Sequence, residues 1–189
     1  MRNLSWEDVE GFSKREFAPP EEPDHKWDMH PTLLTHLVNM RENGLDRFNG
    51  EFRILVHTNG GYSIDGHSKS SLHYGIEADT SLNGIRLGRA VDFHCEHYSD
   101  NHKCWVIVNW IDQLMLLKEA MGGDDEYFGV GLHPNWNQQG FHFDYRMGAR
   151  GGAVWWSKDG KYNTYQPEYF GEAVMDCLNW ESRKEFIDK

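Results

Sequence analysis

The stretch "GFHFDYR", residues 140–146, alternates aromatic and polar residues. Side chains of a β-strand point to opposite faces with a period of two. The aromatic set consists of Phe141, Phe143 and Tyr145. The polar set consists of His142, Asp144 and Arg146. The alternation predicts a strand with one face in the core and one polar face, which is either the floor of a site or an ordinary solvated surface.

Composition indicates a single globular domain, residues 1–189. The chain has 39% hydrophobic and 26% charged residues, which favours a packed core over disorder. Its formal net charge of −11 argues against nucleic acid and anionic membranes as partners, because both attract basic surfaces. No apolar run approaches the ~20 residues of a membrane span, so we expect no membrane insertion.

The opening residues, "MRNLSWEDVEGF", have acidic side chains and no apolar centre. We therefore expect no signal peptide and a protein that is cytoplasmic at synthesis. The three cysteines, Cys95, Cys104 and Cys177, form no CxxC pair, which predicts free thiols.

Helices and strands alternate in the expected order of elements. Apolar spacing predicts helices, and short β-branched or aromatic runs predict strands. The expected helices cover 30–43 (ended by Gly44), 101–121 and 168–180. The expected strands cover 51–58, 88–95, 127–132, 140–146 and 152–156. This pattern predicts an α+β fold with a small antiparallel sheet flanked by helices. In "AVWW", 153–156, alternation places one tryptophan in the core and the other beside a cleft.

Two further segments contain metal-ligand residue types. "SSLH" ends at His73, and in "GRAVDF", residues 88–93, Asp92 lies on the strand face opposite Val91 and Phe93. Two histidines and one carboxylate are a common catalytic zinc set that leaves a coordination position for water. Spacing alone does not select these residues among the eleven histidines of the chain.

The order of the motifs resembles that of the zinc D-alanyl-D-alanine carboxypeptidases. This family includes bacteriophage endolysins and shares its fold with lysostaphin-type peptidases and the sonic hedgehog signalling domain. The matching stretches are "SLH" (71–73), "LGRAVDF" (87–93), "GVGL" (129–132), "GFHFDYR" (140–146) and "AVWW" (153–156). The resemblance covers about residues 30–156 and leaves 158–189 as a C-terminal extension.

By this resemblance, His73, Asp92 and His142 bind Zn²⁺ on the face of the sheet. The implied reaction is hydrolysis of a peptide bond in peptidoglycan, in stem peptides or cross-links. The resemblance implies either a D-alanyl-D-alanine carboxypeptidase or an endopeptidase of the endolysin kind, which a phage lysis system would release to the cell wall.

The sequence departs from the family in the distance between two of these ligands. Asp92 follows His73 by nineteen residues, as if "YGIEADTSLNGI" were inserted. The segment "HYGIEAD" nearly repeats the motif, so Asp79 is a rival ligand. We favour Asp92, because "GRAVDF" is the better match and lies on an expected strand.

The usual general base and substrate-binding arginine are also missing. The positions that usually hold the base are Gln139 and Gly140, so Asp144 and His133 are the catalytic candidates. Asp144 could instead orient a ligand imidazole. "NGGYS", 59–63, lacks the arginine that holds a terminal carboxylate in the family, and Arg53, Arg89 and Arg146 are the alternatives.

Because these two residues are missing, the sequence leaves open whether the protein is an exopeptidase, which cuts at a chain end, or an endopeptidase, which cuts an internal bond. The sequence also leaves open a second function: a non-catalytic domain that is stabilised by zinc and binds a cell-wall or protein partner.

Overall fold

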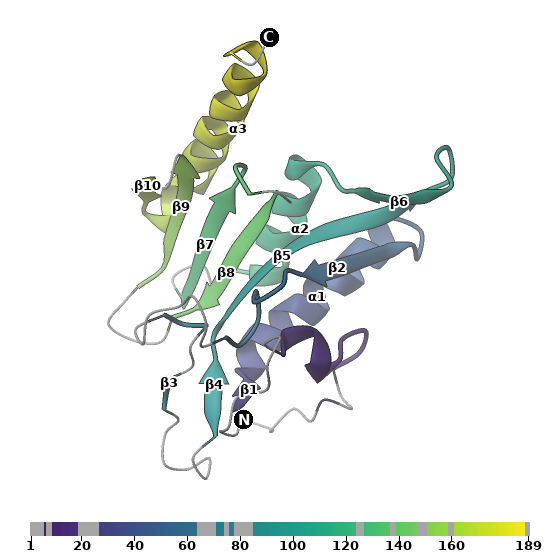
Figure 1. Ribbon diagram of the computed structural model, residues 1–189, viewed down its shortest axis with the longest axis vertical. Coiled ribbons are helices and arrows are strands. Elements are labelled where there is room, and N and C mark those ends of the chain that lie inside the picture. The colour runs from purple at the N-terminus through teal and green to yellow at the C-terminus, as the bar shows by residue number, and fades with distance from the viewer. Residues whose placement is uncertain are drawn as a thin grey trace.

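Figure 1 shows the computed structural model of the chain. It describes residues 6, 9–18, 27–63, 71–73, 76–77, 85–123, 127–136, 139–146, 151–158 and 161–187. Within these ranges the fold is mixed α+β, as predicted. The helices are α1 (Pro31–Arg47), α2 (Trp110–Met121) and α3 (Phe170–Ile187), with short 3-10 helices η2 (Lys14–Phe17) and η6 (Pro167–Tyr169).

The strands of the described residues form two sheets. They are β1 (Trp27–Met29), β2 (Phe52–Val56), β3 (Ile76–Glu77), β4 (Arg86–Gly88), β5 (Ala90–Ser99), β6 (Cys104–Ile107), β7 (Phe128–His133), β8 (Gly140–Tyr145), β9 (Ala153–Lys158) and β10 (Lys161–Tyr165). The larger sheet has the order β10-β9-β7-β8-β5-β2, with β6 paired to the end of β5. The smaller sheet has the order β1-β4-β3.

The larger sheet is mixed rather than purely antiparallel. β7 and β8 pair antiparallel, but β9 pairs parallel to β7 on its other edge. The chain leaves β8 and enters β9 at the same end of the sheet, so β9 runs in the direction of β7. The smaller sheet also contains a parallel pair, β1 with β4.

Helices α1 and α2 cover one face of the larger sheet (Figure 1). The core lies between these helices and the sheet, and Phe93, Phe141 and Phe143 are fully buried in it. Tyr145 is half-buried and packs against this core. The predicted alternation in 140–146 is therefore confirmed, and His142 and Asp144 lie on the opposite face of β8, away from the aromatic core.

Helix α1 continues past Gly44, so the prediction that Gly44 ends it is wrong. A Cβ atom built on Gly44 would lie 2.3 Å from the ring of Phe52. The glycine therefore lets the helix approach strand β2 closely, and the helix ends later, with Phe48 as its C-cap.

Replacing Gly44 with alanine is expected to lower the free energy of unfolding by up to about 2 kcal/mol. Overpacking against Phe52 costs roughly 1–3 kcal/mol, and the ~1 kcal/mol gain in helix propensity offsets only part of it. Urea denaturation measures the difference. Gly171→Ala in α3 is the control, because no atom lies within 4 Å of its added Cβ. Equal stability of the two variants would contradict the prediction.

The predicted helix 101–121 is wrong in its first half. Residues 104–107 form β6, paired with β5, and α2 begins after Asn109, whose side chain accepts a hydrogen bond from the backbone N–H of Asp112. Strand β10, residues 161–165, was not predicted. It pairs with β9 along its whole length, and α3 follows as the closing helix.

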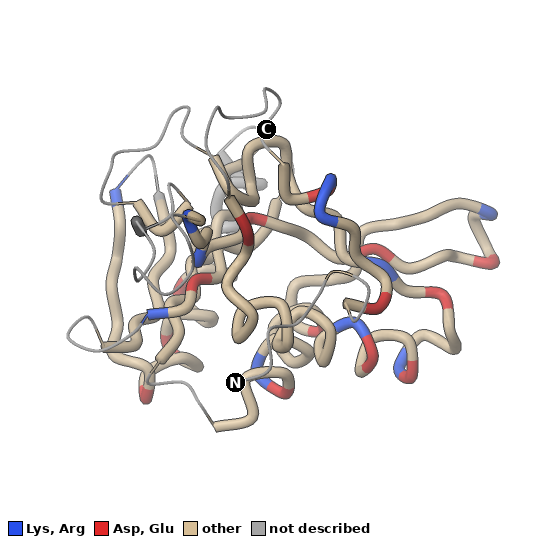
Figure 2. The backbone as a smooth tube through the Cα atoms, turned by 90° about the horizontal axis from the view of Figure 1, so that it is seen from below, with Lys and Arg blue, Asp and Glu red and all other residues tan. Residues whose placement is uncertain are grey.

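Charges of both signs are spread over the described elements. Figure 2 shows Lys and Arg positions scattered along the backbone and interleaved with acidic ones. None of the described helices is both long and apolar enough to cross a membrane.

Candidate metal centre

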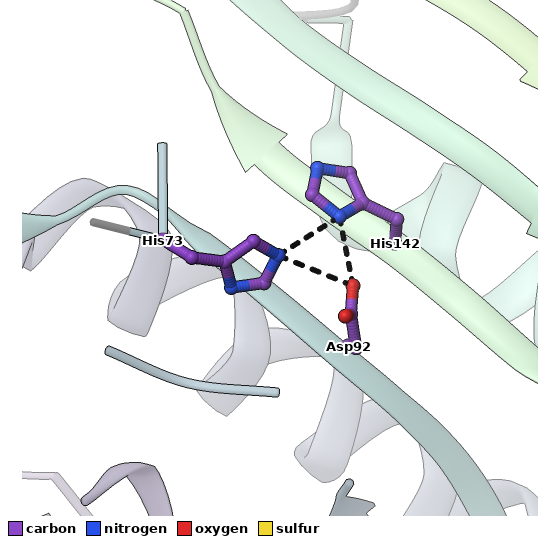
Figure 3. Close-up of side chains that lie close together, drawn as sticks. All are labelled: His73, Asp92 and His142. Atoms are coloured by element: carbon purple, nitrogen blue, oxygen red, sulfur yellow. Dashed lines mark hydrogen bonds and ion pairs between the residues drawn. The ribbon is translucent and has the colours of Figure 1, made fainter. Parts of the chain in front are cut away.

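Three side chains from separate segments meet on the polar face of the larger sheet (Figure 3). Asp92 on β5 and His142 on β8 are directly paired neighbours. His73 Nε2 lies 3.1 Å from His142 Nδ1 and 3.4 Å from Asp92 Oδ1. His142 Nδ1 and Asp92 Oδ1 are 2.7 Å apart. These three residues could hold a metal ion, since each offers one ligand atom to a common point.

The backbone of residues 71–73 fixes the position of His73. The carbonyl of His73 accepts a hydrogen bond from the N–H of Ser63, and the carbonyl of Leu72 accepts one from the N–H of Arg89. The Nδ1 atom of His73 is 2.9 Å from the carbonyl oxygen of Gly61. A carbonyl only accepts, so Nδ1 carries the proton and the Nε2 lone pair faces Asp92 and His142.

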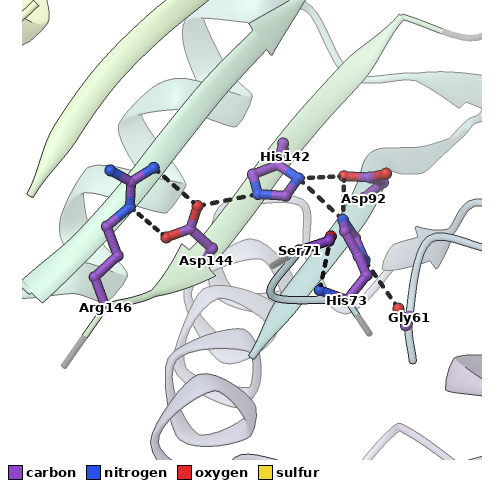
Figure 4. A network of polar contacts seen from close by, with 7 residues as sticks. All are labelled: Gly61, Ser71, His73, Asp92, His142, Asp144 and Arg146. Carbon is purple, nitrogen blue, oxygen red and sulfur yellow. Dashed lines mark hydrogen bonds and ion pairs between the residues drawn. The ribbon is translucent and has the colours of Figure 1, made fainter. Parts of the chain in front are cut away.

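Asp144 binds the side of the His142 ring that faces away from Asp92 and His73 (Figure 4). Its Nε2–H donates to Asp144 Oδ2 at 3.0 Å, which leaves Nδ1 to face the other two side chains. Arg146 in turn donates to both oxygens of Asp144, at 2.7 and 3.1 Å. A carboxylate that accepts from the second nitrogen of a ligand imidazole fixes its ring and tautomer.

The charges of this network shift the pKa of each carboxylate and of His142. Burial alone would raise the pKa of Asp92, but the His142 charge and the hydrogen bond from His142 hold it well below its usual range. Asp144 is similar: burial opposes ionisation, but hydrogen bonds from His142 and Arg146 lower its pKa. Burial alone would lower the pKa of His142, but Asp92 and Asp144 raise it to about 9.

This raised pKa predicts that metal binding releases a proton. In the metal-free protein His142 is protonated at pH 7, because its pKa is about 9. The charged His142 therefore stabilises the folded state. This contribution is complete below pH 6.5, the ordinary pKa of histidine, and is lost as the pH rises through about 9. A metal ion at Nδ1 displaces the proton there.

Calorimetric titration with Zn²⁺ at pH 7, in two buffers of different ionisation enthalpy, is expected to show about one proton released per ion. The part of this release that comes from His142 should fall toward zero above about pH 9, whereas a proton lost by zinc-bound water would remain. Metal binding without proton release at pH 7 would contradict the ionisation state inferred for His142.

A cavity of about 480 Å³ opens beside the three candidate ligands, within the range of small-molecule sites. Its other lining residues are Ser71, His133, Trp136, Arg146, Ala153, Trp155, Tyr162 and Thr164. His133 stacks on Trp136, with ring centroids 3.9 Å apart. Burial, together with the charges of His142 and His57, lowers the pKa of His133 to about 4, so its ring is neutral at pH 7.

Two glycines of β7 make room for this arrangement. A Cβ on Gly129 would lie 2.5–2.6 Å from the side chains of Arg146 and Asp144. A Cβ on Gly131 would lie 2.7 Å from the Trp155 ring and 2.9 Å from His133 Nε2. The "GVG" segment therefore lets the polar and aromatic side chains lie close over the sheet.

The structure brings together His73, Asp92 and His142, and it places both catalytic candidates beside them. Asp144 lies behind His142 with its oxygens bound by His142 and Arg146, and His133 lines the cavity. The rival ligand, Asp79, lies outside the described residues.

The arginines and tryptophans take different positions. Arg146 lines the cavity, and Arg53 pairs with Glu96. Trp156 is buried and Trp155 lines the cavity, as the alternation predicts. The sequence did not indicate Trp136, Tyr162 or Thr164. Alternation in 161–165 was the available signal for the last two, but that segment was not predicted as a strand.

Comparison of the chain with protein-family models, with curated proteins and with solved structures gave no match.

Proposed function

We propose that this protein is a zinc peptidase of the D-alanyl-D-alanine carboxypeptidase and hedgehog fold type that hydrolyses peptide bonds in peptidoglycan. The observation that supports this proposal most strongly is the convergence of His73, Asp92 and His142 beside an open cavity. The substrate class is inferred from the sequence resemblance.

Zinc fits this group of donors. Imidazole nitrogen with one carboxylate oxygen is a donor set typical of zinc. Ligands ~2.1 Å from a tetrahedral ion lie ~3.4 Å from one another. The observed separations of 2.7, 3.1 and 3.4 Å need only a small expansion to reach this value.

The surrounding residues have separate roles in the proposed reaction. Bound zinc would supply a Lewis acid and lower the pKa of a water molecule. Asp144 and Arg146 hold the His142 ring in its ligand tautomer. Because the oxygens of Asp144 accept from His142 and Arg146, we assign the proton acceptor role to His133, whose ring is neutral at pH 7 and lines the cavity.

The experiment that tests the function combines a metal assay with a cleavage assay. The purified protein is loaded with zinc, its metal content is measured, and it is incubated with peptidoglycan while released fragments are followed by mass spectrometry. About one zinc ion per chain and new peptide termini are expected, and both are lost in His142→Ala. Absence of bound zinc would overturn the proposal.

The second candidate function is a zinc-stabilised binding domain without catalysis. The observation that favours it is the engagement of Asp144 by His142 and Arg146, which leaves His133 as the assigned base. Stoichiometric zinc with no cleavage of peptidoglycan would support this alternative.

Replacing Asp144 with asparagine is expected to weaken zinc binding by roughly 10- to 100-fold, the usual cost of losing a partner of a ligand imidazole. The asparagine keeps the volume but loses the charge that His142 and Arg146 require. Competition with a metal chelator measures the affinity. The control is Asp176→Asn in α3, whose carboxylate pairs with Tyr165 rather than with the candidate centre. Equal affinities in the two variants would contradict the role given to Asp144.

A further inference from the structure

The strand register places one continuous row of residues across the sheet, starting at the metal centre. Asp92 pairs with His142, His142 with Gly131, Gly131 with Trp155, and Trp155 with Thr164. Directly paired residues point to the same face. The row therefore runs from β5 to the edge strand β10, and its distal members, Trp155 and Thr164, line the same cavity as His73 and Asp92.

A second set of rings borders this row. Trp136 stacks on His133, and the ring of Tyr162 on β10 meets His133 edge-on, with centroids 6.3 Å apart. All three residues line the cavity. Gly131, between His142 and Trp155 in the row, has no side chain, and the Trp155 ring and His133 lie close over it. The cavity therefore has a floor across the strands and an aromatic wall.

The dimensions of this floor suit an extended chain. From β8 to β10 there are three steps between strands, which is roughly 14 Å at the usual spacing. An extended peptide advances ~3.3 Å per residue, so about four residues fit between His142 and Thr164. Trp155, Thr164 and Tyr162 are uncharged, and the guanidinium of Arg146 is held by Asp144. These contacts favour uncharged side chains.

We propose that the substrate is a peptide that continues on one side of the scissile bond for about four residues across β7, β9 and β10, where Trp155, Tyr162 and Thr164 bind it. This inference rests on the proposed function and defines its substrate more narrowly. Peptides that end within one or two residues of the bond on that side are poor substrates. Tyr162 determines specificity without touching the candidate ligands.

The test compares Tyr162→Ala with Tyr169→Ala in zinc-loaded protein. Both tyrosines are exposed, at 65% and 47%, but only Tyr162 is among the residues that line the cavity beside the metal centre. The substrates are cross-linked muropeptides, prepared from peptidoglycan with a muramidase, and short alanine peptides. For the muropeptides, Tyr162→Ala is expected to raise KM by about three- to tenfold, the cost of one aromatic contact. We expect the zinc content of Tyr162→Ala to be unchanged, and we expect Tyr169→Ala to keep the wild-type zinc content, kcat and KM.

Binding of the muropeptides, followed by tryptophan fluorescence, separates this inference from the proposed function. If Tyr162→Ala and Tyr169→Ala cleave the muropeptides with the same KM, the extended subsite is overturned but the proposed peptidase function is supported. Binding that is weakened only in Tyr162→Ala, without cleavage by any variant, would support the subsite and overturn the catalytic function. If the muropeptides are neither bound nor cleaved, both the extended subsite and the proposed peptidase function are overturned.

Discussion

Asp92→Asn is expected to weaken zinc binding by well over ~100-fold and to abolish peptide hydrolysis. Losing a residue that only hydrogen-bonds a metal ligand costs up to ~100-fold in affinity, and losing a ligand should cost more. The substitution keeps the shape of the side chain but removes its negative charge. Asp92 is the carboxylate donor of the group and lies 2.7 Å from His142 Nδ1 and 3.4 Å from His73 Nε2. Chelator competition measures the affinity, and release of peptidoglycan fragments measures the activity.

Glu96→Gln is the matched control for this variant. Glu96 lies on the same face of β5, four residues further on, and its side chain is 15% exposed, against 17% for Asp92. Its carboxylate pairs with Arg53 and His94 instead of the candidate centre. Zinc affinity is expected to stay at the wild-type value in Glu96→Gln. If Asp92→Asn binds zinc as tightly as Glu96→Gln does, Asp92 is not a ligand.

Phe143→Ala is expected to lower the free energy of unfolding by about 3–5 kcal/mol, the usual cost of removing a fully buried phenylalanine. Phe143 stacks on Phe128, with centroids 4.9 Å apart, and has no exposed surface. It lies on β8 between His142 and Asp144, on the opposite face. Urea denaturation in the presence of a chelator measures the loss. Added zinc is expected to restore part of it, because only the folded state forms the site.

Met175→Ala provides the comparison for Phe143→Ala, since Met175 is a large apolar residue that is exposed on α3. Its replacement is expected to change the stability by no more than roughly 0.5 kcal/mol. A loss below ~1 kcal/mol in Phe143→Ala would show that β8 does not form the centre of the core.

Several features of the fold were predictable because they depend on neighbouring residues. The period of two in a strand fixes which side chains share a face, so the separation of Phe141 and Phe143 from His142 and Asp144 follows from the sequence. The α+β class follows from the mixture of short strands and amphipathic segments. The three candidate ligands were selected by the motif resemblance, because spacing could not select them among the histidines.

Other features depend on partners far along the chain. The apolar run 104–107 fits a helix or a strand, and its pairing with β5 decides for the strand. Gly44 has the usual properties of a helix end, but the ring of Phe52 makes it a point of close packing within the helix. Strand β10 has weak local signals and exists through its hydrogen bonds to β9.

The candidate site divides in the same way. Local alternation determined that His142, Asp144 and Arg146 share a face, and that Trp155 and Trp156 do not. Only the tertiary structure decided that Asp144 is held by both His142 and Arg146, that His133 stacks on Trp136, and that the cavity extends to Tyr162. The reason is physical: a strand fixes the direction of its own side chains, but which other segments meet them depends on pairing between strands and on packing across the sheet.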